Sequence, residues 1–472
     1  MRSLSVPSVF SAGRWRTADE LDAQARRWRA AAVEATGGQV RPIATAIPAT
    51  PDGVALFAAL SSLPVPLILL SPDVRAWPSL APLPQGTPLL LAPGLEHLAA
   101  HALRMGCVPH VLPDHARRAS DPPLPLLHSP GVVIFTSGST GAPKPVFRPM
   151  AALIAGAAAR LDALGLESGD GIIAGVSLAH GQGVTLLISS MLLGGPFALL
   201  SPASHRAALA TLAMPEFVLW RATAHFAAVL GRCELVRPPV VPRLCLLSNP
   251  ISKDAFDAFL DRFGVPLRQG YSSTETGCIA VDAGPVAAVR RDTVGRPLAG
   301  VEVRVGDHPE RPLAAGEVGR IWVRSPWQMA GYGFPPEAER RGAIDDWWPT
   351  QDLGRWTEDG QLTLAGRVDD CVRTREGRLV NFVDVADRLR ELRGVRRVQV
   401  VPLEGPAGIA FGAVIECDPL TGLTALQQQV LEALPSWALP RKLALVPTLP
   451  LLPNGKPDRQ ACLAVLEAPA AR

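Results

Sequence analysis

The chain has 472 residues, of which 48% are hydrophobic and 19% are charged, so it is long enough for two or three domains and too apolar for global disorder. The net charge of +3 is too balanced to predict a nucleic-acid or membrane-surface partner. The seven cysteines show neither a CxxC pair nor zinc-ligand spacing, which favours a reduced, cytoplasmic protein. The first residues lack the apolar run of a signal peptide, and no apolar run reaches the ~20 residues of a membrane span.

Apolar residues alternate between helical and strand patterns over the first 250 residues. Residues 18–35 place Ala, Leu and Trp at helical spacing and predict an amphipathic helix. The pattern then predicts strands at 65–70 and 88–93, a helix at 151–165, a strand at 171–175, a buried helix at 184–195 and a strand at 243–248. This alternation predicts an α/β fold.

The residue patterns after about position 300 differ from those of the first 250 residues. Residues 301–306 and 318–324 alternate apolar with polar residues and predict a smaller antiparallel unit. Strands at 397–403 and 411–417 and a helix at 423–434 then predict a compact α+β domain. We therefore predict a large N-terminal domain at 1–366 and a small C-terminal domain at 367–472.

Lysine and tyrosine are rare in this chain. Only four of the 46 basic residues are lysines, at positions 144, 253, 442 and 456, and the two tyrosines are Tyr271 and Tyr332. Arginine covers generic positive charge, so each lysine is a candidate position for a compact ammonium group that the planar guanidinium does not replace.

A loop rich in hydroxyl groups and glycine follows the apolar strand at 132–135. Glycines let backbone N–H groups converge on an anion, and hydroxyl groups and a lysine add donors and charge. The loop is not a Walker A motif, because its lysine follows Gly-Ala-Pro. We predict a phosphate-binding loop formed by Thr136, Ser137, Gly138, Ser139, Thr140, Gly141 and Lys144.

The segment FTSGSTGAPK at 135–144 resembles the core phosphate loop of the adenylate-forming superfamily, which contains acyl-CoA synthetases, peptide-synthetase adenylation domains and luciferases. These enzymes join a carboxylate to AMP, release pyrophosphate and usually pass the acyl group to a thiol. The resemblance implies ATP and Mg²⁺ as cofactors. It also implies a multi-subdomain N-terminal α/β domain of the acyl-CoA synthetase type and a small, mobile α+β C-terminal domain.

The segment GYSSTE at 270–275 resembles the family motif YGxTE, with Ser272 in place of glycine. The resemblance implies that Tyr271 lies against the adenine, that Ser272 and Thr274 contact the nucleotide, and that Glu275 binds Mg²⁺ together with Thr136. A flat aromatic face suits a purine, and a carboxylate oxygen suits a hard cation.

Three further motifs follow in the family's order. The segment TQD at 350–352 resembles [ST]GD and implies that Asp352 binds the ribose hydroxyls. The segment GRVDD at 366–370 resembles GRxDD, so Arg367 would reach the ribose or phosphate and Asp369 would be the hinge of the C-terminal domain. Tyr332 fits the family's GY segment, as a packing residue.

The segment NGKPDR at 454–459 resembles the C-terminal NGKxDR signature. The resemblance implies that Lys456 bridges the substrate carboxylate and the α-phosphate during adenylation. A cation placed where charge develops in the transition state is electrostatic catalysis.

The chain departs from the family pattern at two places. The stretch after GRVDD is one residue longer before Gly377, and Asp384 stands in the usual place of Glu, which bears on the geometry of the thiol step. Asn249 and Pro250 replace small residues of the family's SGGAPL segment, so the floor of the acyl pocket is expected to differ.

The acyl pocket is expected to take a flat aromatic acid. The resemblance places His180, Gly181, Ser248, Asn249 and Gly270 around this pocket. Residues 177–183 contain no acidic side chain to hold a substrate ammonium, which argues against amino acids. The short N-terminal part resembles ligases of bacterial aryl-polyene and xanthomonadin pigment biosynthesis, so 3- or 4-hydroxybenzoate is our preferred acid.

The expected thiol acceptor is CoA or the phosphopantetheine of an acyl carrier protein. An arginine cluster in the C-terminal domain could attract either acidic partner; it comprises Arg388, Arg390, Arg393, Arg396 and Arg397. Alternatives are a medium- or long-chain fatty acyl-CoA or acyl-AMP ligase, an adenylate former without a thiol step, and a nucleotide-binding module without turnover. The protein is expected to be a monomer or a homodimer.

Overall fold

The computed structural model describes residues 4–80, 82–113, 123–136, 143–200, 205–233, 240–247, 251–335, 343–373, 378–403, 410–418, 422–451 and 457–468. The chain divides into two compact units. The first unit comprises residues 1–304, 322–349 and 356–363, and the second comprises 305–321, 350–355 and 364–472. The α/β fold with a large N-terminal and a smaller C-terminal domain is confirmed, whereas the boundary at 366 stays a prediction.

One sheet of the first unit runs in the order β18-β8-β7-β4-β3-β5-β6. Its strands are β18 (Gly331–Tyr332), β8 (Pro145–Pro149), β7 (Gly131–Phe135), β4 (Leu67–Leu70), β3 (Ile43–Ala46), β5 (Pro88–Leu91) and β6 (Val108–Val111). Strands β7, β4, β3, β5 and β6 are parallel, while β8 is antiparallel to both β7 and β18. The β7–β8 hairpin therefore carries the predicted phosphate loop.

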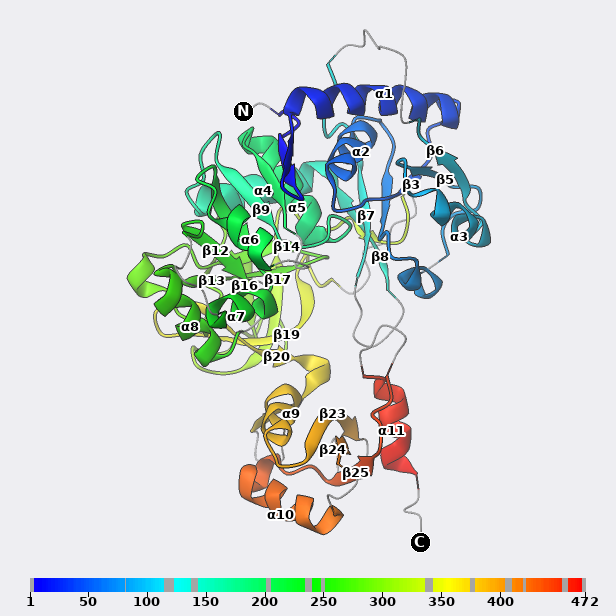
Figure 1. The fold of residues 1–472 in the computed structure, drawn as a ribbon. Coiled ribbons are helices and arrows are strands. Elements are labelled where there is room, and N and C mark those ends of the chain that lie inside the picture. Colours follow the sequence, from blue (N-terminus) through cyan, green and yellow to red (C-terminus); the bar gives the residue numbers. More distant parts are fainter. Residues whose placement is uncertain are drawn as a thin grey trace. The chain divides into compact units, whose positions relative to one another are not determined.

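Helices accompany this sheet, and threonine hydroxyl oxygens cap the N-termini of the first two. They are α1 (Ala18–Thr36), α2 (Pro51–Ser61) and α3 (Ala99–Arg104), and α1 packs on α2 (Figure 1). Thr17 and Glu20 form a capping box at the start of α1, and Gly37 ends that helix with a φ of 60°. The helix predicted at 18–35 is thus confirmed.

A second sheet of the first unit runs in the order β15-β14-β13-β12-β11-β9-β10-β1-β2. Its strands are β15 (Arg296–Pro297), β14 (Gly277–Val281), β13 (Leu267–Ser273), β12 (Leu244–Leu247), β11 (Phe217–Arg221), β9 (Gly171–Ala174), β10 (Phe197–Leu199), β1 (Val9–Ser11) and β2 (Arg14–Arg16). Strands β1, β10, β9, β11, β12 and the first part of β13 are parallel. The last part of β13 pairs antiparallel with β14, so Thr274, Glu275 and Thr276 form a hairpin turn.

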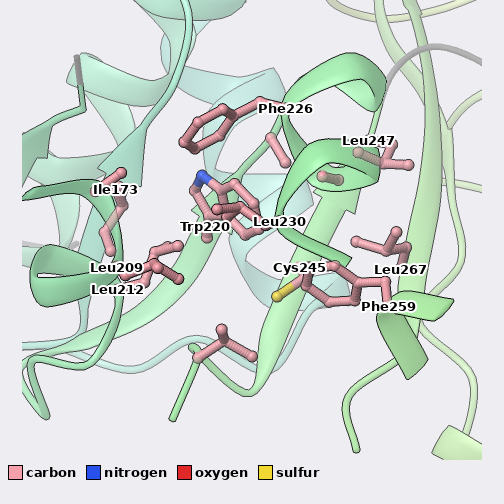
Figure 2. Packing of buried hydrophobic residues seen from close by; sticks show 14 of the residues in the cluster. Ile173, Leu209, Leu212, Trp220, Phe226, Leu230, Cys245, Leu247, Phe259 and Leu267 are labelled. Carbon is pink, nitrogen blue, oxygen red and sulfur yellow. The ribbon is translucent and has the colours of Figure 1, made fainter. Parts of the chain in front are cut away.

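The helices of this part of the chain are α4 (Met150–Ala163), α5 (Gly181–Leu193), α6 (His205–Leu212), α7 (Ala224–Arg232) and α8 (Lys253–Phe263). One face of the second sheet buries an apolar cluster that includes Trp220 of β11, Cys245 of β12 and Phe259 of α8 (Figure 2). Because side chains alternate along a strand, the residues next to Trp220 and Cys245 point to the opposite face.

A further sheet runs in the order β16-β17-β19-β20. Its strands are β16 (Glu302–Val305), β17 (Gly319–Arg324), β19 (Trp348–Trp356) and β20 (Leu362–Arg367). The strands predicted at 301–306 and 318–324 are therefore neighbours in one sheet.

The C-terminal part of the second unit is the predicted α+β fold. It contains the pair β21 (Cys371–Arg373) and β22 (Leu379–Asn381), and the sheet β23 (Val395–Leu403), β24 (Ala410–Cys417) and β25 (Lys442–Val446). Helices α9 (Phe382–Arg390) and α10 (Leu423–Ala433) pack with one face of this sheet, where Ile415 is buried. Helix α11 (Arg459–Glu467) packs with the other face, where Val414 is buried.

No helix in the described part of the chain is both long enough and apolar enough to cross a membrane.

Candidate active site

The ends of the predicted phosphate loop are held together by two hydrogen bonds. The backbone N–H of Thr136 donates to the carbonyl of Lys144 at 3.0 Å, and the N–H of Lys144 donates to Thr136 Oγ1 at 3.1 Å. These bonds continue the β7–β8 ladder, in which Phe135 pairs with Pro145. The hairpin therefore fixes both points from which the loop leaves the sheet.

Glu275 lies in the turn between β13 and β14, and its carboxylate contacts a residue far along the chain. The hydroxyl of Tyr332 donates to Glu275 Oε1 at 3.0 Å. Burial, together with the charge and the hydrogen bond of Glu275, raises the pKa of Tyr332 well above its ordinary value. The phenol thus stays protonated and remains a hydrogen-bond donor to the carboxylate.

Lys144 completes this group in the first unit. Its Nζ lies 5.4 Å from the centroid of the Tyr332 ring, within the range of a cation–π contact. Strand β18 brings the tyrosine there, because Tyr332 pairs with Val146 of β8. The ring also packs against Trp348, at 5.7 Å between centroids. Lys144, Tyr332 and Glu275 therefore lie together at the described end of the predicted phosphate loop.

Arg148 supports the Glu275 turn from within the protein. It is only 4% exposed, and its guanidinium donates to the carbonyls of Thr274 and Trp327, each at 2.8 Å. Burial outweighs the opposing effect of the Glu275 charge and lowers the pKa of Arg148 to about 10. Arg148 thus fixes the backbone of the turn and places positive charge near its carboxylate.

The remaining described residues of the YGxTE-like segment lie on β13 and in the turn. Tyr271 is buried and pairs with Ala280, while Ser272 and Thr274 are half-buried. A Cβ added to Gly270 would lie 3.5 Å from Leu246, so this glycine borders a neighbouring side chain at ordinary contact distance. The adenine and phosphate contacts of this segment stay predictions.

His180 and Gly181 lie at the start of α5. His180 is exposed and occupies the N-cap position, and its side chain makes no capping hydrogen bond to the helix. A Cβ on Gly181 would lie 3.8 Å from Ile134 of β7. The placement of both residues in an acyl pocket stays a prediction.

The predicted ribose-binding residues lie together within the second unit. Arg367 Nη1 is 3.7 Å from Asp352 Oδ1. The hydroxyl of Thr350 accepts the backbone N–H of Asp352 at 3.2 Å and donates to the carbonyl of Ile321 at 2.8 Å. Thr350, which is buried, thus holds the backbone beside the Asp352 carboxylate.

The predicted hinge segment is joined to the C-terminal helix by an ion pair between Asp370 and Arg459. Asp369, the predicted hinge residue, lies in the short 3₁₀ turn Val368–Asp370. Leu451 forms a β-bridge with Pro457, and the N–H of Asp458 donates to the carbonyl of Pro450 at 2.9 Å. These contacts bring together both ends of the segment in which Lys456 lies.

Several predicted site residues lie outside the described residues. They are Ser137, Gly138, Ser139, Thr140 and Gly141 of the loop, Ser248 and Asn249 of the pocket segment, and Lys456. Within the described residues, no group of three or more His, Cys, Asp or Glu side chains could hold a metal ion.

Sequence reasoning missed the polar role of Tyr332 and the position of Arg148. Tyr332 was expected to be a packing residue, yet its hydroxyl contacts the carboxylate of Glu275. The rarity of tyrosine was the available signal, because phenylalanine could have packed there equally well. Nothing in the local sequence indicated that Arg148 would be buried under a turn about 126 residues away.

The arginine cluster of the C-terminal domain is partly neutralised. Arg390 pairs with Asp387, and Arg396 Nη2 lies 2.7 Å from Asp418 Oδ1. All of these side chains are substantially exposed, so the pairs are weak individually. The two aspartates lower the net positive charge of this surface below what the arginine cluster alone indicated. The attraction of an acidic partner to the cluster stays a prediction.

Known relatives cover most of this chain. It is 26% identical to novobiocin biosynthesis protein H of Streptomyces niveus over 96% of the chain and 79% of that protein. It is 27% identical to the anthranilate–CoA ligase of Pseudomonas aeruginosa over 68% of the chain and 64% of that protein. The chain spans only 4% of the length of malpibaldin synthetase from Mortierella alpina, to which it is 32% identical over 44% of its own length.

Solved structures share the fold over nearly the whole chain. The amide bond synthetase McbA of Marinactinospora thermotolerans matches with a TM-score of 0.77 and 26% identity, covering 98% of this chain and 97% of that one. The O-succinylbenzoate coenzyme A synthetase of Bacillus subtilis, in complex with ATP and magnesium, matches with a TM-score of 0.78 and 21% identity, covering 97% and 96%. The family model described as AMP-binding enzyme matches residues 5–333, and the chain therefore belongs to this family of adenylate-forming, ATP-using enzymes.

Proposed function

We propose that this protein activates a carboxylic acid with ATP, forms an acyl-adenylate with release of pyrophosphate, and passes the acyl group to a thiol. The observation that carries the proposal is that Lys144, Tyr332 and Glu275 contact one another where hydrogen bonds join the two ends of the predicted phosphate loop. A cation and an oriented carboxylate at one loop are what a Mg²⁺-bound polyphosphate needs.

Lys144 would contact the phosphates, because it is exposed at the loop's exit and its ammonium is held over the Tyr332 ring. Glu275 is suited to Mg²⁺, because its carboxylate is half-buried and oriented by one phenol, while protein magnesium sites commonly use only one or two carboxylates plus phosphate oxygens. Thr136 would add a hydroxyl oxygen. When bound, Mg²⁺ would neutralise charge on the phosphate oxygens.

The second unit would supply the ribose contacts and the catalytic lysine. Asp352 and Arg367 are already paired at 3.7 Å, so the carboxylate is oriented before it accepts hydrogen bonds from ribose hydroxyls. Lys456 would stabilise charge at the α-phosphate during adenylation and Asp369 would act as the hinge; both assignments rest on the family resemblance.

The proposed acid is aromatic, such as 3- or 4-hydroxybenzoate, as in the pigment-pathway ligases. The similarity to an anthranilate–CoA ligase and to an O-succinylbenzoate coenzyme A synthetase supports an aromatic class. The proposed acceptor is CoA or a carrier-protein thiol. The similarity to an amide bond synthetase makes an amine the acceptor to test beside them. A cytoplasmic location and a monomeric or dimeric state stay predictions.

The proposal is tested by exchange of labelled pyrophosphate into ATP. Exchange should require Mg²⁺ and an added acid, with benzoates compared against fatty and amino acids. The absence of acid-dependent exchange with every class would overturn the proposal. Preference for a fatty acid would keep the activity and reject the aromatic class.

The two steps can be separated by variants of the second unit. Lys456→Ala should lower adenylation by ~10²–10³-fold, as loss of an electrostatic transition-state contact does, while thiolysis of supplied acyl-adenylate persists. Asp369→Pro should spare adenylation and block transfer to CoA, to a holo carrier protein or to an amine. Equal loss of both steps in Lys456→Ala would contradict the role assigned to this lysine.

A further inference from the structure

Asn381 joins the two sides of the predicted hinge segment. Its Nδ2 donates to the carbonyl of Ala365 at 3.0 Å, and Ala365 lies on β20, before the 3₁₀ turn Val368–Asp370. Asn381 itself ends β22, after that turn, and pairs with Cys371 of β21. One side-chain hydrogen bond therefore spans the turn that contains Asp369, and both of its partners belong to the second unit.

The side-chain amide of Asn381 is used at both of its ends. Its Oδ1 accepts the backbone N–H of Val383 at 2.8 Å and so caps the N-terminus of α9. These two partners also fix which side-chain atom is the nitrogen, because only the amide nitrogen donates to a carbonyl. An aspartate at this position would keep the cap and lose the bond to Ala365.

The use of asparagine for this cap is unusual in the chain. Asparagine occurs only three times in 472 residues. The other side-chain caps of the described α-helices are threonine, serine or aspartate, namely Thr17, Thr50, Thr223, Ser252 and Asp458. Serine and aspartate cap a helix about as well as asparagine does. The cap alone therefore does not require asparagine, which differs from aspartate by the N–H group that reaches Ala365.

Gly366 leaves room for the contact between Asn381 and Ala365. It has a φ of 127°, and a Cβ placed on it would lie 2.8 Å from Asn381 Nδ2 and 2.9 Å from Cys371 Sγ. Both distances are too short for a real Cβ, so any other residue here would crowd the amide. The hydrogen bond across the turn thus depends on a glycine directly after Ala365.

Rotation at Asp369 would sort the contacts around it into two groups. A hinge residue absorbs the change in φ and ψ, so the residues after it move together relative to the residues before it. The β21–β22 pair and the ion pair of Asp370 with Arg459 have both partners after Asp369, so rotation leaves them intact. The bond from Asn381 to Ala365 has one partner on each side and has to break.

We propose that the hydrogen bond from Asn381 to Ala365 is a conformational latch, which holds the C-terminal part of the chain in the conformation of this structure and opens between adenylation and transfer. The inference rests on the proposed function for these two steps and for Asp369 as the hinge. A neutral hydrogen bond shifts an equilibrium by ~2–10-fold. The latch thus biases the two conformations without locking either of them.

The first experiment needs no activity and tests the latch itself. Amide hydrogen exchange is measured without substrates for the wild type, Asn381→Asp and Asn381→Ala. Asn381→Asp retains the cap and loses the donor, so exchange across 366–371 should rise by ~2–10-fold while α9 keeps its protection. Asn381→Ala should raise exchange in both segments, because the cap is lost as well. Unchanged exchange at 366–371 in Asn381→Asp would overturn the inference, whether or not any acid is activated.

The second experiment measures two single-turnover rates, for formation of the acyl-adenylate and for its transfer to the acceptor that the wild type uses. Asn381→Asp should change the ratio of these rates by ~2–10-fold, because the latch stabilises one of the two conformations. Gly366→Ala, which crowds the same amide, should shift the ratio in the same direction.

Gln429→Glu is the matched control. It adds the same charge in the C-terminal part of the chain, at a side chain whose Oε1 accepts the N–H of Arg393 at 3.0 Å, and both partners lie after Asp369. Its ratio of rates should equal that of the wild type. A wild-type ratio in Asn381→Asp, or an equal shift in the control, would contradict the inference and leave the proposed function standing. If no acid yields an adenylate, the proposed function fails and hydrogen exchange alone decides on the latch.

Discussion

The hydrogen bond between Tyr332 and Glu275 offers a direct test of how the site is organised. Tyr332→Phe removes only the hydroxyl, and the ring can still pack on Trp348 and face Lys144. A hydrogen bond to a charged group contributes ~1.5–3 kcal/mol. Because the 3.0 Å bond orients the carboxylate proposed to bind Mg²⁺, its loss should lower exchange by ~10–100-fold, at 1.36 kcal/mol for each factor of ten.

The assay is pyrophosphate exchange at varied Mg²⁺ for the wild type, Tyr332→Phe, Glu275→Gln and the double variant. Tyr332→Phe should raise the Mg²⁺ concentration needed for half-maximal exchange, because the carboxylate loses its orientation. The double variant should be only slightly worse than Glu275→Gln, since both changes disrupt one interaction. Additive losses, or an unchanged Mg²⁺ requirement in Tyr332→Phe, would refute the positioning role of this tyrosine.

Three further predictions concern stability. Gly366→Ala should cost more than the control Gly316→Ala, because both glycines have positive φ but only at Gly366 would a Cβ approach within 3 Å of other side chains; equal urea midpoints would contradict this. Asp370→Asn should lose the ion pair to α11 and speed amide hydrogen exchange in that helix; unchanged protection would argue against it. Burial raises the pKa of Asp282 above 3.8, so the folded protein retains a proton that the unfolded chain has released. The free energy of unfolding should therefore fall as pH rises from the unfolded-state pKa of Asp282 towards its higher folded-state pKa. Asp282→Asn should remove this pH dependence in urea titrations at several pH values.

Local sequence patterns were sufficient for many elements of the fold. Helix α1 was predictable because its apolar spacing, its Thr17–Glu20 capping box and its terminal Gly37 all act within a few residues. The strands predicted at 65–70 and 171–175 correspond to β4 and β9, which are short apolar runs buried in parallel sheets. Sheet order was not predictable, because it depends on packing between segments far apart in the chain.

For the rare lysines, too, the sequence explained some positions and the fold explained others. Lys144 was identified from its motif, and its contact with Tyr332 became visible only in the fold. Lys442 matched no motif, yet its Nζ donates to the carbonyl of Leu466 at 2.9 Å near the end of α11. A cation near a helix C-terminus satisfies free carbonyls and the helix dipole. Lys253 forms an exposed pair with Asp257 one turn along α8.

The sequence by itself predicted the phosphate loop, the order of the family motifs and elements such as α1, α5 and β9, because each depends on residues close together in the chain. Tertiary structure decided which side chains meet. The β18–β8 pairing brings Tyr332 to Lys144 and Glu275. The burial of Tyr332 beside Glu275 keeps its phenol protonated, since a charge is costly only where the fold removes water.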